Sequence, residues 1–186
     1  PLDEVNRIVR IVLHPSLSTG EKTGETQRWY VDLSTFDTTI QEDLARRDFT
    51  IDAMAIDLQD LMENPASFRI IDPLKGQDDL RRRTLRAVNE KVFESDPARL
   101  LRAVRLAAEL DFSIEARTAA LIRRSCGLVN RVAGERVREE LLRVLAHPAA
   151  GQFVRYLDDL GLLINVIPEL EASRGVEQPK EHHWDV

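Results

Sequence analysis

Residues 45–55 read Ala-Arg-Arg-Asp-Phe-Thr-Ile-Asp-Ala-Met-Ala, and residues 96–106 read Asp-Pro-Ala-Arg-Leu-Leu-Arg-Ala-Val-Arg-Leu. The first stretch sets two arginines and a carboxylate in front of an apolar run, which predicts a strand over residues 49–57. The second opens with an N-cap carboxylate and a proline, and its apolar period predicts a helix that runs to about Leu110. The two stretches mark where a strand-bearing part of the chain gives way to a helical part.

The same division extends outward in both directions. Alternating apolar and polar residues predict strands over 7–13 and 28–36, joined as a hairpin by the polar turn at 18–25. Further elements are predicted as a strand at 69–72 and helices at 41–47, 77–82, 115–126, 134–146 and 149–160. We therefore predict an α+β chain with a domain break near residues 85–92.

Composition sets broad limits on the class of protein. The 186 residues are 43% apolar, enough for a packed core, and the net charge is −6. Between Arg81 and Arg143 there are 15 Lys and Arg against 9 Asp and Glu, which suits phosphate binding, although composition alone favours solvated helix faces. No apolar run is long enough to span a membrane, and Cys126 is the only cysteine, so we expect a cytoplasmic protein with no membrane partner.

Asp96 and Arg99 are three residues apart, so a helix places them side by side. A carboxylate accepts from an exocyclic amine and a guanidinium donates to a ring nitrogen, which matches the Watson–Crick edges of cytosine and adenine but not those of uracil and guanine. Arg102 and Arg105 continue the face in steps of three and are candidates for contacts with phosphates or the base. An alternative of equal weight is that Asp96 only caps the helix and the arginines lie in solvent.

Arg46 and Arg47 are candidates to hold a triphosphate, with Asp48 orienting one of them, and the alternative is a salt bridge within a turn. Asp32 lies among apolar neighbours in a predicted strand, so it is either on the solvent face or functional. Two-metal phosphoryl transfer needs clustered carboxylates to hold Mg²⁺. Asp32 is a candidate for one such ligand but cannot form the site alone.

Other polar clusters favour plain surface roles. The acidic pairs at 78–79 and 158–159 are adjacent on predicted helices, so their side chains diverge, which favours solvated faces over metal sites. The arginine triplet at 81–83 fits a solvated helix face as well as it fits RNA phosphates. The histidines at 182–183 are neighbours that point apart, which is poor geometry for one metal ion.

Four motifs resemble, in order and spacing, those of the class II tRNA nucleotidyltransferase and bacterial poly(A) polymerase family. They are Glu42–Ile51, the connection Ile71-Asp72-Pro73 with Gly76 and Asp79-Leu80, the helix motif Asp96–Arg99 with Leu101–Arg105, and Glu135–Leu141. The resemblance implies part of a polymerase-β-type nucleotidyltransferase head with a mixed sheet over 1–88. It also implies an all-helical neck over 89–170 that selects the nucleotide and binds RNA. Residues 171–186 resemble a linker at the start of an HD-type domain.

The resemblance also implies an activity and a set of site residues. The activity is addition of CMP and AMP from CTP and ATP to the 3′ end of tRNA, without a template and with Mg²⁺. Asp32 takes the place of a catalytic and metal-binding carboxylate. The implied nucleotide-binding residues are Arg46, Arg47, Asp96, Arg99, Arg102 and Arg105. The oligomeric state is left open.

The chain departs from the family pattern in three respects. Ser95 stands where a glutamate usually precedes the template aspartate, and Asp52 stands where an asparagine is usual, which puts a charge near the phosphates. The glycine-rich loop and the Asp-x-Asp pair that bind the metals are absent. Because the chain also begins at Pro1 and stops at Val186 without a helix end, we expect a fragment of a longer protein that does not catalyse by itself.

Several functions share these motifs, and the sequence does not separate them. The alternatives to CCA addition are a bacterial poly(A) polymerase, an enzyme restricted to adding A or CC, and a non-catalytic RNA-binding module that kept the scaffold. An intact Asp-x-Asp pair elsewhere in the full-length protein favours catalysis, and its loss favours the binding module.

Overall fold

The computed structural model describes residues 8–13, 29–35 and 38–176. They belong to two compact units, one within residues 1–40 and one within residues 41–186, and each is described by itself. The predicted turn at 18–25 and the stretch 177–186 lie outside the described residues.

The first unit contains the predicted pair of strands. Its strands β1 (Ile8–Leu13) and β2 (Trp29–Ser34) run antiparallel, and their register sets Arg10 opposite Asp32. The alternation of apolar and polar residues therefore identified both strands and their pairing.

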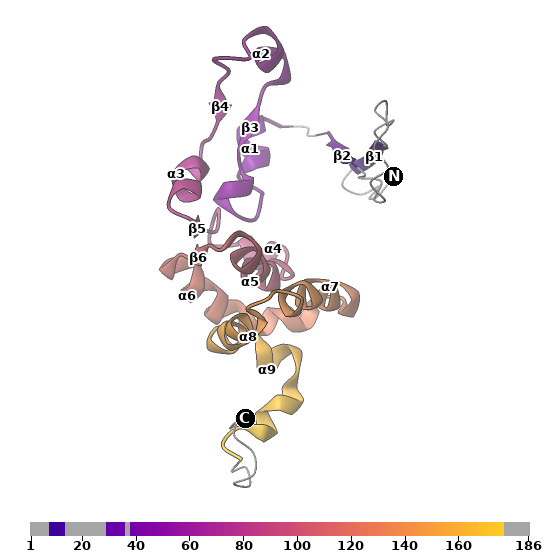
Figure 1. The fold of residues 1–186 in the computed structure, drawn as a ribbon, viewed down its shortest axis with the longest axis vertical. Helices are drawn as coiled ribbons and strands as arrows, with labels where there is room; N and C mark the ends of the chain where they lie inside the picture. The colour runs from indigo at the N-terminus through magenta and orange to yellow at the C-terminus, as the bar shows by residue number, and fades with distance from the viewer. Residues whose placement is uncertain (1–7, 14–28, 36–37, 177–186) are drawn as a thin grey trace. The chain divides into compact units, whose positions relative to one another are not determined.

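Short elements open the second unit. They are α1 (Ile40–Leu44), the 3-10 helix η1 (Thr50–Asp52), β3 (Ala55–Ile56), α2 (Leu58–Glu63), β4 (Ile70–Ile71), α3 (Gly76–Arg81) and β5 (Thr84–Leu85). Strand β3 pairs antiparallel with β4, and α2 lies at the far end of this ribbon (Figure 1). The sequence patterns did not predict α2 or β5.

The strand predicted over 49–57 is wrong except for β3. Phe49, Thr50 and Ile51 are buried one after another, whereas a strand sends successive side chains to opposite faces. The backbone turns instead, and the amide of Asp52 donates to the carbonyl of Phe49 at 3.0 Å. The Thr50 amide is held from outside by the carbonyl of Arg86 at 2.9 Å, so a partner distant in sequence fixes this turn.

The rest of the second unit is mainly helical. It contains α4 (Val92–Ser95), α5 (Arg99–Leu110), β6 (Ser113–Ile114), α6 (Ala116–Ser125), η2 (Cys126–Arg131), α7 (Gly134–Leu145), α8 (Ala150–Asp159), α9 (Leu163–Val166) and η3 (Pro168–Ser173). Helix α5 packs against α7 and α8, and β6 pairs parallel with β5 (Figure 1). The α+β expectation is confirmed. Helix α6 ends one residue before the predicted end at 126, and the chain continues as η2.

The long helices end where the chain takes a left-handed conformation. Helix α5 stops at Asp111, whose φ is +54°, and the amide of Phe112 donates back to the Ala107 carbonyl at 3.0 Å. This closure satisfies a carbonyl that the helix leaves without a partner. Helix α8 ends in the same way before Gly161, whose φ of +72° suits a residue without a side chain.

One apolar core joins residues from both sides of the predicted break at 85–92. Phe49 precedes the break and Phe93 follows it, and both are fully buried in the same cluster. Leu101 and Val104 of α5 contribute to that cluster at helical spacing.

A buried polar network fixes the turn at η1 against α3. The Thr50 hydroxyl donates to Asp79 Oδ2 at 2.6 Å, and Arg86 Nε donates to the same oxygen at 2.9 Å. Asp79 is only 5% exposed, so its expected place on a solvated face is wrong; the Asp78 side chain, in contrast, is 48% exposed and pairs with Arg81. Gly76 allows this approach, because a Cβ there would lie 2.1 Å from the Thr50 carbonyl oxygen.

Candidate functional site

The two stretches that opened the sequence analysis meet around one hollow of about 240 Å³. It lies where the turn after α1 faces the N-terminal end of α5 and the first turns of α7. Its lining is strongly charged and consists of Arg47, Asp48, Asp96, Ala98, Arg99, Arg102, Arg136 and Glu140. Four predicted site residues, Arg47, Asp96, Arg99 and Arg102, are therefore brought together; Arg46 and Arg105 are not part of the lining.

Asp96 caps the start of α5 and also binds Arg136. Its Oδ1 accepts from the Ala98 amide at 3.2 Å, and the assigned helix begins only at Arg99, later than predicted. Arg136 donates to both carboxylate oxygens, at 3.0 and 2.8 Å. Burial of Asp96 opposes its ionisation, but the hydrogen bonds and charge of Arg136 outweigh that cost and hold the pKa below its usual value.

Arg99 stands beside Asp96 without forming a close ion pair. Its Nε lies 4.0 Å from Asp96 Oδ2. The guanidinium donates instead to the carbonyl oxygens of Arg46, at 3.1 Å, and Arg47, at 3.5 Å. A weaker contact of 3.4 Å reaches the Ser95 hydroxyl. Arg99 thereby connects α5 to the backbone of the arginine pair.

Asp48 faces Arg102 and not the arginines that precede it. Arg102 Nε lies 2.7 Å from Asp48 Oδ2, and Asp48 Oδ1 accepts from the Phe49 amide at 3.1 Å. The expectation that Asp48 orients Arg46 or Arg47 is therefore wrong. The Arg102 N–H is not aligned with this oxygen, so a buried donor lacks a hydrogen-bond acceptor among the described residues.

Arg46 and Arg47 follow α1 and do not precede a strand as predicted. Arg47 Nη2 donates to Asp43 Oδ2 at 2.9 Å, and Arg46 Nη2 lies 3.5 Å from Asp43 Oδ1. Asp43 thus takes the place that the sequence assigned to Asp48. Both arginine side chains are more than half exposed, so each stays accessible to a ligand.

The expectation that Arg105 continues the same face toward the ligand is wrong. Its side chain is 4% exposed, and it donates to Glu140 Oε2 at 2.5 Å and Glu109 Oε2 at 2.6 Å. Each step of three residues turns about 60° backwards around an α-helix, so two steps from Arg99 rotate the side chain by about 120°. That rotation carries Arg105 from the hollow into the contact between α5 and α7.

Asp52 lies near the hollow on η1 and is exposed to water. Partial desolvation, followed by the charge of nearby Asp48, raises its pKa above the usual value, and Arg102 and Arg105 only partly offset this. The departure from the family's asparagine therefore places a carboxylate where ionisation is unfavourable.

Asp32 belongs to the first unit and is engaged by Arg10. Its two carboxylate oxygens accept from Arg10 Nε at 2.6 Å and Nη2 at 2.7 Å, and the Arg10 hydrogen bonds lower its pKa. Within the described ranges no three His, Cys, Asp or Glu residues gather as a metal site. The donor set present therefore does not fit a bound Mg²⁺, because the one candidate carboxylate already has a cationic partner.

The site residue that sequence reasoning missed is Arg136. Arg136 belongs to the recognised motif Glu135–Leu141, but its partner Asp96 lies 40 residues away in sequence. Spacing along one helix carries no information about such a contact. Glu140, four residues further along α7, was missed for the same reason.

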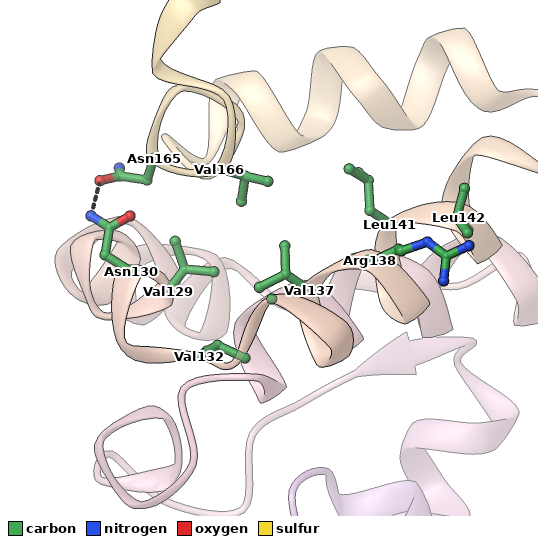
Figure 2. Close-up of a pocket in the computed structure, with 10 residues that line it drawn as sticks. Val129, Asn130, Val132, Val137, Arg138, Leu141, Leu142, Asn165 and Val166 are labelled. Carbon is green, nitrogen blue, oxygen red and sulfur yellow. Dashed lines mark hydrogen bonds between the residues drawn. The ribbon is translucent and has the colours of Figure 1, made fainter.

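A second hollow of about 400 Å³ lies between η2, α7 and α9 (Figure 2). Its wall is mostly apolar, and Val129, Val137 and Val166 project into it (Figure 2). Asn130 Nδ2 donates to Asn165 Oδ1 at 3.3 Å along one edge. This hollow has no acid–base pair and so does not compete with the charged one as a reactive site.

In the described part of the chain, no helix is long and apolar enough to cross a membrane.

Comparisons with known proteins agree with the motifs. Residues 17–86 match the family profile described as "Poly A polymerase head domain", and residues 111–174 match the profile described as "Probable RNA and SrmB- binding site of polymerase A". The chain is 36% identical over 186 residues to a protein named multifunctional CCA protein from Dechloromonas aromatica (strain RCB). That alignment covers 95% of this chain and 43% of the relative.

Two further similarities extend the comparison. An A-adding tRNA nucleotidyltransferase from Deinococcus radiodurans is 36% identical over 191 residues, which is 100% of this chain and 39% of the relative. A solved structure described as a complex of CCA-adding enzyme with ATP aligns with a TM-score of 0.68 and 30% identity, covering 84% of this chain and 36% of that one. The chain thus spans about two fifths of the length of these curated relatives.

Proposed function

This chain belongs to the family of tRNA nucleotidyltransferases and bacterial poly(A) polymerases, and we propose that the full-length protein adds C and A nucleotides to the 3′ end of tRNA. The observation that carries this proposal is the convergence of Asp96, Arg99, Arg47 and Arg102 on one charged hollow. CTP and ATP are the proposed nucleotides, and the tRNA 3′ hydroxyl is the proposed acceptor.

The hydrogen-bonding capacity left at Asp96 and Arg99 supports base selection. A carboxylate offers about four acceptor positions, and the bonds to Arg136 and Ala98 occupy three of those of Asp96. The remaining acceptor position lies on Oδ2, the oxygen that is 4.0 Å from Arg99 Nε. Arg99 retains Nε–H and one Nη2 hydrogen. One acceptor beside free donors is complementary to the amine and ring nitrogen of cytosine or adenine, and it opposes the carbonyl and N–H of uracil or guanine.

The remaining cations of the hollow suit the phosphates. Arg47 is half exposed at the rim, Arg46 is adjacent in sequence, and Arg102 carries a donor that no described acceptor satisfies. Because Arg102 Nε itself is buried beside Asp48, a triphosphate oxygen would meet the exposed part of the Arg102 side chain and the guanidinium of Arg47, adding charge-assisted hydrogen bonds. Arg105 takes a different role from the one implied by the resemblance. It positions α5 against α7 through its two carboxylate partners, Glu140 and Glu109, and does not contact the nucleotide.

A divalent metal, Mg²⁺, is the proposed cofactor of the full-length protein, with Asp32 as one candidate ligand. Asp32 would have to exchange Arg10 for the metal, and further carboxylates from outside the described residues would complete the site. The proposed domain organisation is a partial head over 1–88, a helical neck over 89–170 and a linker over 171–186. The proposed location is the cytoplasm, where tRNA maturation takes place.

The test uses the full-length protein with Mg²⁺ and a tRNA transcript lacking its terminal CCA, given labelled CTP, ATP or both. Growth by CC, then A, followed by a stop, is the expected result. A long A tail would identify a poly(A) polymerase. A alone, accepted only after CC is in place, would identify an A-adding enzyme like the relative from Deinococcus radiodurans. RNA binding without incorporation would favour the non-catalytic module. The isolated 186-residue chain is predicted to incorporate nothing in the same assay.

Base selection has its own variant. Asp96→Asn replaces the acceptor with an amide that also donates, so we expect incorporation of U relative to C to rise and the KM for CTP to increase. Asp78→Asn, at a half-exposed carboxylate that pairs with Arg81 away from the hollow, is the matched control. Unchanged discrimination in Asp96→Asn would remove Asp96 from the selecting pair.

A further inference from the structure

A hollow of about 760 Å³ lies at the other end of α5 from the charged site. It is bounded by the end of α5, β6, α8 and the arginines after α3, and we call it the α8 hollow. A 12-residue helix is about 18 Å long, which sets the distance between the two ends of α5. The α8 hollow therefore cannot be part of the site around Asp96.

The floor and one wall of the α8 hollow are apolar and aromatic. Ala107, Ile114 and Phe153 are buried beneath it, while the rings of Phe112 and Tyr156 are half-buried and line it. The Tyr156 hydroxyl has no hydrogen-bond partner among the residues that the structure describes. Burial raises the pKa of Tyr156, so this hydroxyl stays a neutral donor at physiological pH. Flat, half-buried rings that line a hollow suit stacking of a planar group.

The rim of the α8 hollow carries unpaired charges. Arg82 and Arg155 are exposed, and neither guanidinium has an ion-pair or hydrogen-bond partner within the described ranges. Arg83 lies 3.4 Å from Asp111, and the Asp159 carboxylate remains without a cationic partner among described residues. Two free guanidinium groups favour an anion, whereas the free carboxylate requires a donor on the same ligand.

A nucleotide unit of an RNA chain offers all of these groups at once. Its phosphate is an anion, its base is a planar ring, and its 2′-hydroxyl or exocyclic amine is a donor for Asp159. We propose that the α8 hollow binds one nucleotide of the RNA substrate, with the base against Phe112 and Tyr156 and the phosphate at Arg82 and Arg155. This inference rests on the proposed function for its substrate class, because it assumes that the full-length protein acts on RNA.

The first test measures RNA affinity of the full-length protein without any nucleotide, by fluorescence anisotropy with a tRNA transcript lacking CCA. Arg82→Ala/Arg155→Ala is expected to weaken binding and to lower the salt slope of the affinity by about 1 to 2, because each lost phosphate contact releases one counterion fewer. Arg124→Ala/Arg131→Ala removes the same two charges from exposed positions outside the hollow and is the control. Equal effects of the two double variants would overturn the proposal, since they would show only the loss of net charge.

The second test concerns the aromatic wall. Tyr156→Leu keeps an apolar side chain but removes the ring, and a roughly 5- to 100-fold weaker RNA affinity is expected from the loss of one stacking contact. Tyr156→Phe keeps the ring and is expected to bind within about twofold of the unchanged protein. Because Tyr156→Leu also risks the packing of α8, photo-cross-linking of RNA to the unchanged protein provides a second measurement. Cross-links on the peptide that contains Tyr156 support the proposal, and their absence overturns it.

Further measurements distinguish an RNA ligand from a free nucleotide, and they distinguish failure of this inference from failure of the proposed function. If equilibrium dialysis with free ATP shows a second site that Arg82→Ala/Arg155→Ala abolishes while RNA affinity stays unchanged, the RNA assignment is overturned. If the unchanged protein incorporates no nucleotide but these variants still weaken RNA binding, the proposed function is overturned and the inference stands. Normal incorporation with unchanged RNA affinity in every hollow variant would sink the inference alone. At saturating RNA, the KM for CTP is expected to stay the same.

Discussion

At the residue scale, the charged hollow is organised by which hydrogen-bonding positions remain open after the protein has made its own contacts. Arg136 occupies two acceptor positions of the Asp96 carboxylate, and the carbonyl oxygens of Arg46 and Arg47 occupy donors of the Arg99 guanidinium. If Asp96 and Arg99 had no open hydrogen-bonding positions, they could not bind a base. If they made no contacts with the protein, their side chains would not be held in one orientation. The partial occupancy fixes the direction in which each remaining donor and acceptor points.

Asp52 gives a prediction with a defined pH dependence. Its pKa is raised in the folded state, so its contribution to stability is fully present below the unfolded pKa and is lost as pH rises through the folded pKa. Asp52→Asn should therefore raise the free energy of unfolding at pH 7 by roughly 0.2–0.5 kcal/mol, the size of a solvent-screened interaction. The gain should disappear in acid, as chemical denaturation at several pH values would measure. The KM for nucleotide should also fall, because a negative charge near the phosphates is removed.

The control for Asp52→Asn is Glu169→Gln, which neutralises an exposed carboxylate far along the chain in η3. It should leave both the stability profile and the KM unchanged. A gain in Asp52→Asn that is the same at acidic and neutral pH would contradict the electrostatic explanation.

Arg105 tests whether the contact between α5 and α7 depends on a buried cation. Arg105→Met leaves Glu140, whose side chain is 16% exposed, without a positive partner, and we expect a loss of about 3–5 kcal/mol in the free energy of unfolding. Arg105→Met/Glu140→Met should recover most of that loss, because apolar groups of similar size can replace a buried pair. Denaturant unfolding measures both. Arg117→Met breaks an exposed pair with Glu90 and should cost much less, because solvent screens that pair.

At the element scale, the turn at η1 holds the arginine pair and Asp48 relative to α5. The turn is set by the close approach of α3, which only a glycine at position 76 permits. Strand β5 adds the Arg86 carbonyl for the Thr50 amide and the Arg86 guanidinium for Asp79. The geometry of the hollow thus depends on elements that do not line it.

Gly76→Ala should therefore change the geometry of the charged hollow, although Gly76 does not line it. The new Cβ would meet the Thr50 carbonyl oxygen, so α3 or η1 must move, at a cost of about 2 kcal/mol or more. We also expect a higher KM for nucleotide, because η1 begins only two residues after Asp48. Gly151→Ala is the matched control, since nothing lies within 4 Å of its Cβ position and alanine is the better helix former in α8. Thermal unfolding and nucleotide titration of both variants decide the matter, and equal behaviour would refute the packing argument.

The elements also show what the sequence could predict. Helices α5, α7 and α8 were found because their apolar period and end signals lie within the helix itself. The two-residue strands β5 and β6 were missed because each is held by the other, with paired residues 29 positions apart in sequence. The same limit applied to the site, because only contacts within one helix could be predicted. Asp96 and Arg99 lie three residues apart and were found together. The Arg136 contact was missed because it depends on how α7 packs, and the burial of Arg105 was missed because it depends on which way α5 is rotated.

At the scale of the molecule, the second unit joins segments that the domain prediction separates at residues 88 and 89. Arg99 Nη2 donates to the Arg46 carbonyl at 3.1 Å, and Phe49 and Phe93 share one core. The Glu115 amide donates to the Leu85 carbonyl at 3.0 Å, so backbone hydrogen bonds cross the break as well. An evolutionary domain boundary and a boundary of folding cooperativity are different properties, and these contacts argue that here they do not coincide.

Native-state hydrogen exchange on the full-length protein tests this coupling. The amides of Thr50, before the break, and Glu115, after it, should exchange with the same opening free energy and the same denaturant dependence, because one cooperative unit opens both. The Thr50 residue is fully buried and its amide is bonded to Arg86, so local fraying gives no separate route. Arg105→Met, which weakens only the contact between α5 and α7, should lower both opening free energies by the same amount. The alternative result is that Thr50 exchanges through a smaller opening whose free energy Arg105→Met leaves unchanged. Residues 41–88 would then unfold independently of the helices. In that case the charged hollow around Asp96 would lie on a boundary able to open during each nucleotide addition.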